Sequence, residues 1–155
     1  MNNKVVLAFS GGLDTSFCVP YLKEKGYEVH TVMVNTGGFS AEEEKAIESR
    51  ALALGAASHK NVNAVETYYT KGIKYLIYGN ILKNATYPLS VSSERVFQAL
   101  EVLKHVKELG AGAVAHGSTG AGNDQVRFDI VFEILAPEVK IIAPVRDEGF
   151  TRQFE

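Results

Sequence analysis

Several features that often reveal a function are missing from this 155-residue chain. A single cysteine, Cys18, excludes an internal disulfide and any zinc site built from several cysteines. No apolar run approaches the roughly 20 residues that cross a bilayer as a helix, so we expect no membrane-spanning segment. The net charge is -2, so there is no basic excess that would bind nucleic acid through its phosphates.

The remaining composition is that of an ordinary globular protein. A length of 155 residues suits one domain, 1–155, and 46% hydrophobic residues are enough to build a core. The first residues, MNNK, lead directly into a predicted strand and do not resemble a signal peptide. With one cysteine, the cytoplasm is the simplest location. We expect Cys18 to be a small buried core residue; the alternative is a reactive thiol at a helix start.

The two commonest glycine-rich nucleotide loops are also absent. G-x-x-x-x-G-K-[ST] occurs nowhere, and neither does G-x-G-x-x-G. The chain has instead SGGLDTS at residues 10–16, between an apolar run at 5–9, predicted to be a buried parallel strand, and a predicted helix at 17–25. Glycines let backbone N–H groups approach a phosphate, and hydroxyls and a helix N-terminus add donors. The alternative is a tight strand-to-helix turn that binds no ligand.

Strand and helix patterns alternate along the whole chain. The predicted strands are residues 5–9, 28–34, 57–62, 113–116 and 140–143. The predicted helices are residues 17–25, a segment capped by SAEE at 40–43 and ended by Gly55, residues 65–78, a segment around 96–106 ended by Gly110, and residues 125–135. This alternation predicts an α/β fold with an open, doubly wound parallel sheet and helices on both faces. Pro20 conflicts with a helix that starts at Thr15, so the first helix either begins later or bends.

A second dense motif, HGSTGAGNDQVRF, occupies residues 116–128. Asn123 offers donors and acceptors, Asp124 can accept from an ammonium group, and Arg127 can clamp a carboxylate. Taken singly, Asn123 and Asp124 are also good helix caps, and Arg127 can be a solvated helix residue. Ligands bind at the carboxyl ends of the strands in open parallel sheets. The glycine-containing loops after the first, second and fourth predicted strands should therefore share one rim.

The S-G-G-x-D-[ST]-S turn resembles the PP-loop of the ATP pyrophosphatase superfamily, which has an adenine nucleotide alpha hydrolase-like fold. Three blocks together resemble the N-terminal nucleotide-binding domain of the argininosuccinate synthase family. They are residues 8–16, residues 87–89 with Ser92 and Arg95, and residues 115–128, and the closing IAPVR at 142–146 also fits. The resemblance covers essentially the whole chain. The block at 115–128 is more discriminating than the PP-loop, which many enzymes share.

The resemblance implies an ATP-dependent ligase of arginine biosynthesis that uses Mg²⁺. Such an enzyme forms citrullyl-AMP and pyrophosphate from citrulline and ATP, and aspartate then displaces AMP to give argininosuccinate. The implied ATP-binding residues are Ala8, Phe9, Ser10, Gly11, Gly12, Leu13, Asp14, Thr15, Ser16, Val34 and Gly117. The implied citrulline-binding residues are Tyr87, Ser92, Asn123 and Arg127, and those for aspartate are Thr119, Asn123 and Asp124. Arg95 is a further family-based candidate, His116 is expected to be structural, and no residue is assigned to a metal or as a nucleophile.

The chain also departs from the family pattern. After the second predicted strand the family has a small residue and then an acid, whereas this chain has Val34 and Asn35; residues 90–94, SVSSE, replace a Gly- and Thr-rich apolar run. Family members continue into a synthetase domain and a C-terminal oligomerisation helix, and they form tetramers. We therefore expect this chain to be the truncated ATP-binding domain of a homo-oligomeric enzyme, and to turn over little or not at all.

Two alternatives remain at this stage. Another PP-loop enzyme, such as a tRNA thiolase or an amidotransferase synthetase domain, would share the glycine turn, but thiolases need catalytic cysteines and a basic surface, and the amidotransferases need a glutaminase domain. A non-catalytic nucleotide-binding module of the universal-stress type would share the sheet and would not need residues 123–127. Pyrophosphate release separates these classes, and its substrate dependence separates the enzymes.

Overall fold

The computed structural model describes residues 2–149 of the chain. Five parallel strands form one sheet in the order β3-β2-β1-β6-β7. They are β1 (Lys4–Ala8), β2 (Glu28–Asn35), β3 (Ser58–Asn63), β6 (Ala113–His116) and β7 (Lys140–Ile142). The predicted parallel sheet is confirmed, and each predicted strand is found with its ends shifted by at most one residue.

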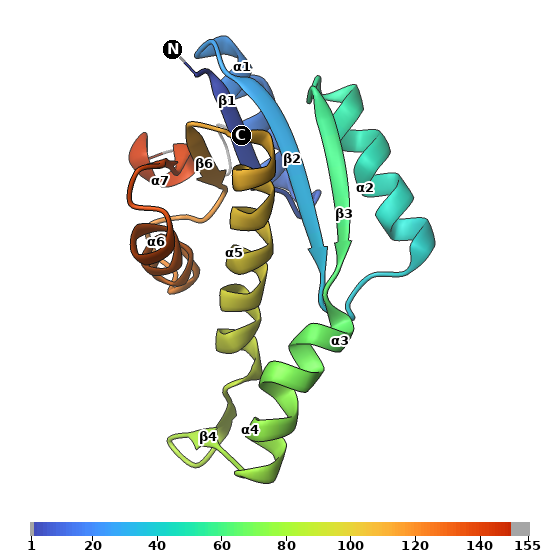
Figure 1. The fold of residues 1–155 in the computed structure, drawn as a ribbon, viewed down its shortest axis with the longest axis vertical. Helices are drawn as coiled ribbons and strands as arrows, with labels where there is room; N and C mark the ends of the chain where they lie inside the picture. Colours follow the sequence, from blue (N-terminus) through green and yellow to red (C-terminus); the bar gives the residue numbers. More distant parts are fainter. Residues whose placement is uncertain (1, 150–155) are drawn as a thin grey trace.

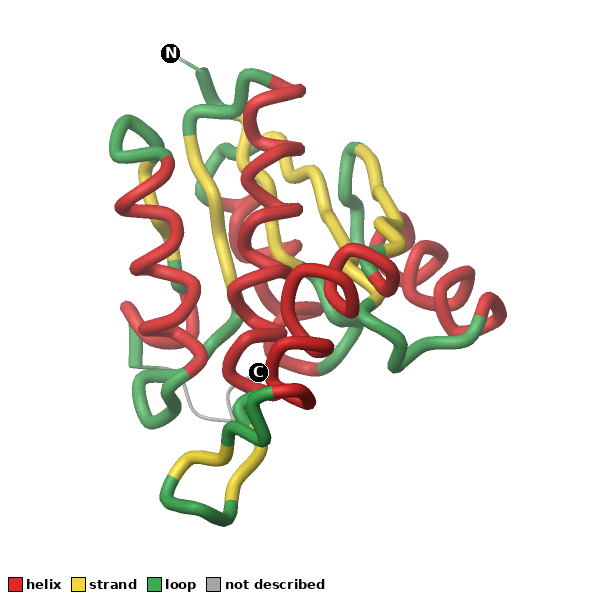
Figure 2. The backbone as a smooth tube through the Cα atoms, turned by 60° about the horizontal axis from the view of Figure 1, so that its bottom comes forward, coloured by secondary structure: helices red, strands yellow, loops and turns green. Residues whose placement is uncertain are grey.

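Helices cover both faces of this sheet (Figures 1 and 2). On one face lie α1 (Leu13–Glu24), α2 (Ala41–Ala53) and the short α7 (Pro144–Asp147), and on the other lie α5 (Ser90–Leu109) and α6 (Asp124–Leu135). Successive β1 side chains alternate between the two layers, with Val5 and Leu7 in one core and Val6 in the other. The doubly wound arrangement predicted from the sequence is confirmed.

Local sequence signals start and end several of these helices as expected. Ser40 Oγ accepts a hydrogen bond from the Glu43 backbone N–H, and the Ser40 N–H donates to the Glu43 carboxylate at 2.8 Å, so the predicted capping box of α2 is present. Gly110 follows α5 with a φ of 58°, in the left-handed region that favours glycine. Cys18 is fully buried in the core, as expected.

The start of the first helix was predicted wrongly. It begins at Leu13 and not at residue 17, and Pro20 lies inside it. The proline removes the hydrogen bond that the backbone of residue 20 would donate to Ser16. Cys18, Val19 and Leu22 are all fully buried on this helix, and their packing outweighs the lost bond.

The segment between β3 and α5 is more elaborate than the single helix predicted at 65–78. It consists of α3 (Val65–Tyr68), a π-helical turn η1 (Tyr69–Ile73) and α4 (Lys74–Tyr78). A small antiparallel hairpin follows, made of β4 (Leu82–Lys83) and β5 (Tyr87–Pro88), which the sequence reading missed. The hairpin and α4 project beyond the end of the sheet (Figure 1). Within residues 2–149, no helix combines the length and the apolar character that a membrane span requires.

Candidate functional site

A cleft of about 1310 Å³ opens at the carboxyl ends of β1, β2 and β6. The loops after these three strands line it, together with the first half of α5, the start of α6 and the β4–β5 hairpin. This confirms the prediction that the three glycine-containing loops share one rim. The site is therefore made from segments that are far apart in the sequence, and the parallel sheet brings them together.

The glycine turn at residues 10–12 forms one wall of the cleft. Gly11 has a φ of 74°, which favours glycine, and a Cβ there would lie 3.0 Å from the Ile47 side chain of α2. Arg50, also on α2, donates to the Gly11 carbonyl, so α2 holds the outer side of the turn. Gly12 is the N-cap of α1 and offers no side-chain acceptor to the first turn of this helix. The N–H groups of that turn therefore remain available to an anion in the cleft.

Hydroxyl groups complete this turn. Ser10 Oγ and Thr15 Oγ1 lie 3.2 Å apart, and Thr15 Oγ1 donates to the Gly12 carbonyl at 3.3 Å. Asp14 lies in the first turn of α1 and also lines the cleft. A short loop with two hydroxyls and one carboxylate at a helix N-terminus suits a phosphate chain that carries a divalent cation.

The loop after β6 packs directly on this turn. A Cβ on Gly117 would lie 3.0 Å from Thr15 Cγ2, 3.1 Å from the Thr15 backbone N and 3.2 Å from the backbone carbonyl carbon of Asp14. Two of these three neighbours are backbone atoms, which cannot move aside without displacing α1. Glycine at position 117 thus permits the close approach of two loops that both line the cleft.

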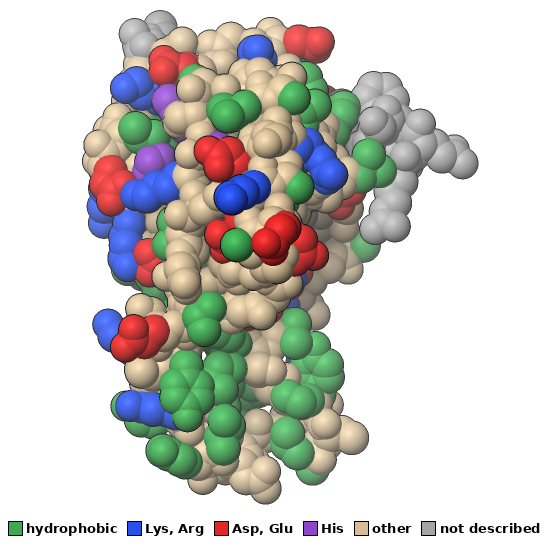
Figure 3. Space-filling view, turned by 90° about the vertical axis from the view of Figure 1, so that its right-hand side faces the viewer, with side chains coloured by type: hydrophobic (Ala, Val, Ile, Leu, Met, Phe, Trp, Pro, Cys, Tyr) green, Lys and Arg blue, Asp and Glu red, His purple; other side chains and the backbone are tan. Residues whose placement is uncertain are grey.

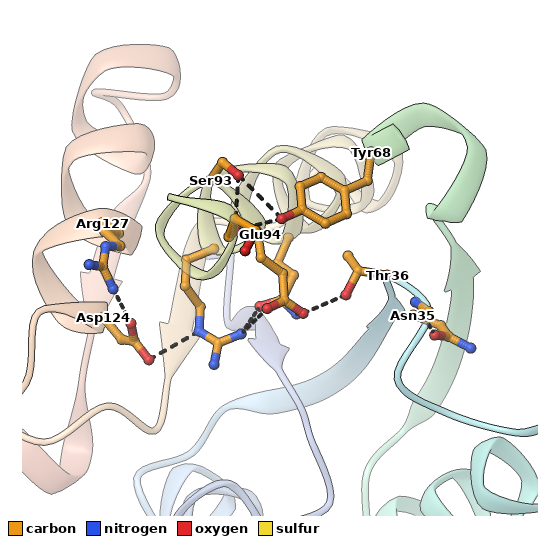
Figure 4. Close-up of polar contacts among 11 residues, drawn as sticks. Asn35, Thr36, Tyr68, Ser93, Glu94, Asp124 and Arg127 are labelled. Carbon is orange, nitrogen blue, oxygen red and sulfur yellow. Dashed lines mark hydrogen bonds and ion pairs between the residues drawn. The ribbon is translucent and has the colours of Figure 1, made fainter. Parts of the chain in front are cut away.

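Three charged side chains that line the same cleft meet in an ion-pair cluster (Figure 4). The Asp124 carboxylate accepts from Arg127 at 2.6 Å and from Arg95 at 3.0 Å. Arg127 also donates to Ser92 Oγ at 2.9 Å. Burial disfavours ionisation of Asp124, but the hydrogen bonds and charges of the two arginines outweigh it and hold the pKa of this carboxyl below its usual range. The cluster therefore presents a carboxylate and two guanidinium groups to the cleft.

The same cluster extends to the loop after β2 (Figure 4). Arg95 lies 3.6 Å from the Glu94 carboxylate, which accepts a hydrogen bond from Thr36 Oγ1. Sequence reasoning missed Glu94 and Thr36 as site residues. The hydrogen bond between them joins the edge of the cleft beside Val34 to the edge beside Asp124. The two residues are 58 positions apart, and no sequence pattern predicts a contact over that separation.

Asn35 occupies the position where the family pattern has an acid, and it organises the loop after β2. Its amide donates to the Phe39 carbonyl at 2.8 Å and to the Glu44 carboxylate at 2.7 Å, and its oxygen accepts from the Gly37 N–H at 2.8 Å. A carboxylate at position 35 would face the carboxylate of Glu44, whereas the amide pairs with it. The surroundings of residue 35 in this chain therefore suit the amide of Asn35 better than the acid of the family pattern.

The predicted site residues fall largely on the walls of this cleft. Those that line it are Ala8, Phe9, Ser10, Gly12, Leu13, Asp14, Thr15, Val34, Tyr87, Ser92, Gly117, Thr119, Asn123, Asp124 and Arg127. Gly11 and Ser16 lie behind the lining, where Gly11 meets α2 and the Ser16 N–H donates to the Gly12 carbonyl at 2.9 Å. Tyr87 is about half exposed and reaches the cleft from β5. In residues 2–149 no group of three or more His, Cys, Asp or Glu side chains gathers as a metal site.

Comparison with known proteins identifies relatives along almost the whole chain. The family model described as the argininosuccinate synthase N-terminal HUP domain matches residues 4–155. The argininosuccinate synthase of Xanthomonas axonopodis pv. citri is 49% identical over 143 residues, which are 92% of this chain and 34% of that protein. The argininosuccinate synthase of Pyrobaculum aerophilum is 45% identical over 154 residues, 99% of this chain and 38% of that protein. The chain thus spans little more than a third of the length of these curated relatives.

Solved structures with low sequence identity share the fold. A predicted subunit of tRNA methyltransferase from Methanocaldococcus jannaschii superposes with a TM-score of 0.61 at 21% identity, over 97% of this chain and 71% of that one. The NMN synthetase of Francisella tularensis superposes with a TM-score of 0.59 at 8% identity, over 76% of this chain and 46% of that one. At such identities the likeness is one of fold alone, and it agrees with the sheet and helix layers described above.

Proposed function

This chain belongs to the family of argininosuccinate synthase N-terminal HUP domains, and we propose that it is the ATP-binding part of an enzyme that joins citrulline to aspartate. In this reaction the ureido oxygen of citrulline attacks the α-phosphorus of ATP, and pyrophosphate leaves as citrullyl-AMP forms. The aspartate nitrogen then attacks the ureido carbon, AMP leaves and a proton is lost, giving argininosuccinate. No side-chain nucleophile is needed, so catalysis would come from positioning and from stabilising phosphate charge.

One observation carries this proposal. A single cleft holds a glycine turn at a helix N-terminus on one wall and the Asp124, Arg95 and Arg127 cluster on another. The first suits the phosphates of a nucleotide, and the second suits the opposite charges of an amino acid. A nucleotide-binding module of the universal-stress type would need only the first, and family membership favours argininosuccinate synthase over other PP-loop enzymes.

The ATP phosphates would lie on residues 10–16 and approach Gly117, with the base beside Val34. Mg²⁺ would accompany the nucleotide and neutralise part of the phosphate charge. Its ligands would be mainly phosphate oxygens and water, because Mg²⁺ is usually bound through one or two carboxylates and substrate phosphates. Asp14, which lines the cleft from the first turn of α1, would be the carboxylate available to it.

The charged groups of the two amino-acid substrates would replace ion pairs that the cluster makes within itself. The citrulline carboxylate would replace Asp124 on Arg127, beside Ser92, which already bonds that guanidinium. Asp124 would then be able to accept from the ammonium group of aspartate, with Thr119 nearby on the same rim. Asn123 would contact both substrates where they meet, and Tyr87 would close over citrulline from the hairpin.

We further propose that the complete enzyme is a cytoplasmic homo-oligomer in which 1–155 is the ATP-binding domain. The curated relatives are much longer than the matched segment, which supports a requirement for further segments in turnover. The chain by itself should therefore bind MgATP and form little or no argininosuccinate.

Isothermal titration with MgATP, alone and with citrulline and aspartate, tests the binding half of the proposal. Gly12→Val is the informative variant because Gly12 has ordinary backbone angles and a Cβ there would meet only Ser10 Oγ, at 3.5 Å. The variant should fold and lose MgATP binding, since the added methyl groups would occupy the turn's open side. Magnesium GTP serves as the nucleotide control.

Pyrophosphate release by the complete enzyme tests the catalytic half. The proposal requires release that depends on citrulline, and AMP formation that then depends on aspartate. Citrulline-independent release would point to another PP-loop enzyme. Absence of MgATP binding by the wild-type chain would contradict the proposed role of its glycine turn.

A further inference from the structure

His116 lies at the end of β6, directly before the cleft loop at residues 117–119. Its side chain is only 1% exposed. The Ser118 backbone N–H donates to its Nδ1 at 3.2 Å, so Nδ1 carries no proton. The other ring nitrogen, Nε2, therefore carries the proton and donates to Asp129 Oδ1 at 2.9 Å. The two contacts together select one neutral form of the imidazole.

Residues of α6 and α7 hold the Nε2 side of the ring. Asp129, on α6, accepts with its second oxygen from Arg146 on α7. Arg146 also pairs with Asp147 at 2.9 Å, and Asp147 accepts from the Ala143 N–H at 3.0 Å. The ring of Phe128 stacks on the imidazole with the centroids 5.5 Å apart and the planes 17° from parallel. The imidazole can neither rotate nor exchange its proton without breaking these contacts.

The consequence of this arrangement lies in the cleft. The imidazole accepts a hydrogen bond from the backbone of Ser118, and Gly117, between these two residues, lies close to the backbone of Asp14 and Thr15. Thr119 follows on the same rim. The hydrogen bond to Ser118 thus connects the His116 ring to the loop that lies beside the glycine turn.

We infer that His116, oriented by Asp129 and Arg146, is a positioning residue that holds the 117–119 loop against the glycine turn and so sets the affinity of the cleft for a nucleotide. The inference rests on the proposed function only in taking ATP as that nucleotide. His116 is not a general base here, because its free lone pair is used by Ser118 and its N–H by Asp129. Burial also lowers the pKa of the imidazole, and the Asp129 carboxylate opposes this only in part.

Two substitutions of His116 separate positioning from simple space filling. In His116→Asn the side-chain oxygen reaches the place of Nδ1 and can still accept from the Ser118 N–H. In His116→Gln the longer amide reaches the place of Nε2, pairs with Asp129 and leaves the Ser118 N–H without its acceptor. If His116 only fills space, the glutamine variant should stay closer to the wild type, because glutamine is nearer to histidine in size. If His116 positions the loop, the asparagine variant should stay closer to the wild type.

The measurements are hydrogen exchange of the Ser118 amide and titration with MgATP. We expect His116→Gln to speed Ser118 exchange and to weaken MgATP binding by about tenfold, as for the loss of one buried hydrogen bond. His116→Asn should stay within about threefold of the wild type in both measurements. Phe132→Leu is the matched control, because Phe132 is fully buried on α6 but packs on Phe128 rather than on His116. It should lower stability without changing either measurement.

The inference would be overturned if His116→Asn weakened MgATP binding more than His116→Gln. It would also be overturned if both variants lost the same MgATP affinity, in proportion to their loss of stability. Nitrogen NMR of the imidazole gives a second reading: Nε2 should be protonated in the wild type, and Asp129→Asn, whose amide can donate to Nε2, should shift the proton towards Nδ1. A wild-type ring protonated at Nδ1 contradicts the inference, and this reading also decides the matter if His116→Gln does not fold. Neither Ser118 exchange nor NMR needs a nucleotide, so a chain that fails to bind MgATP contradicts the proposed function separately.

Discussion

At the scale of single residues, the glycines of the cleft differ in what a side chain would meet there. Gly11 is favoured by its positive φ, and Gly117 by the backbone of α1 that lies against it. Gly122 has neither constraint, because the nearest atom to a Cβ there is 3.9 Å away. Glycines in one motif can therefore be ranked by the cost of adding a single methyl group.

Gly117→Ala should destabilise the fold by about 1–3 kcal/mol, as expected for overpacking against atoms that cannot yield. It should also weaken the binding of MgATP, because the loop must move away from the glycine turn. Urea unfolding and nucleotide titration measure the two effects. Gly122→Ala, in the same loop, should cost less than about 0.5 kcal/mol. Equal costs for both variants would show that the close approach of Gly117 to α1 does not constrain the loop.

Two buried histidines predict how stability depends on pH. Burial lowers the pKa of His116 and of His30, in each case against partial opposition from a neighbouring carboxylate, Asp129 or Glu28. The unfolded chain, with histidine pKa values of about 6.5, then binds more protons than the folded one below that pH. Their contribution to stability is complete above about pH 6.5 and is lost as the pH falls towards the lowered values.

Unfolding by urea at pH 7.5, 6.5 and 5.5 should show this loss of stability in the wild type. In His116→Asn the same decline should be shallower, because one of the two buried groups no longer titrates. Parallel declines in the two proteins would mean that His116 does not contribute to the pH dependence.

At the scale of elements, the helices around the cleft begin in different ways. The start of α2 is held by its own capping box, and α2 in turn supports the glycine turn through Ile47 and Arg50. The start of α1 has no side-chain cap, because Gly12 stands at that position. A helix that binds an anion at its N-terminus needs its first N–H groups free, whereas a supporting helix does not.

Ser40→Ala should destabilise the protein by about 1 kcal/mol, because it removes the acceptor of the Glu43 N–H. Ser49→Ala on the same helix is the control. Ser49 is exposed and donates only to the Lys45 carbonyl within the helix, so its loss should be near neutral. The midpoint of urea unfolding distinguishes the two, and equal midpoints would argue against a stabilising capping box.

At the scale of the whole molecule, the projecting segment carries an apolar surface. Figure 3 shows hydrophobic side chains gathered over the lower part of the molecule, around α4 and the hairpin. The most exposed of them is Tyr78, at 79%, followed by Ile77 at 62%, with Tyr75 and Ile81 nearby in the sequence. Contiguous exposed apolar patches favour association with other surfaces.

We therefore expect the chain to self-associate at high concentration through this segment. Replacing Ile77 and Tyr78 with serine should reduce the association, as measured by sedimentation velocity over a concentration series. Leu52→Ser, at an exposed leucine on α2, is the control and should change little. Association that persists unchanged in the double variant would exclude this surface as its cause.

The sequence by itself determined the order of strands and helices, the capping box, the glycine turn and the cluster of polar residues at 123–127. These features depend on neighbours a few positions apart, where periodicity and side-chain chemistry act directly. The topology rule for parallel sheets was then enough to predict that the loops after Phe9, Val34 and His116 meet at one rim.

Only the tertiary structure decided which long-range contacts override or complete these local signals. Pro20 lies inside α1 because three fully buried neighbours on that helix outweigh one lost hydrogen bond. Asp124 pairs with Arg95 on another helix as well as with Arg127 on its own, and His116 depends on Asp129. Such partners are brought together by packing of helices onto the sheet, and their energies depend on distance and burial in space, which spacing along the chain does not encode.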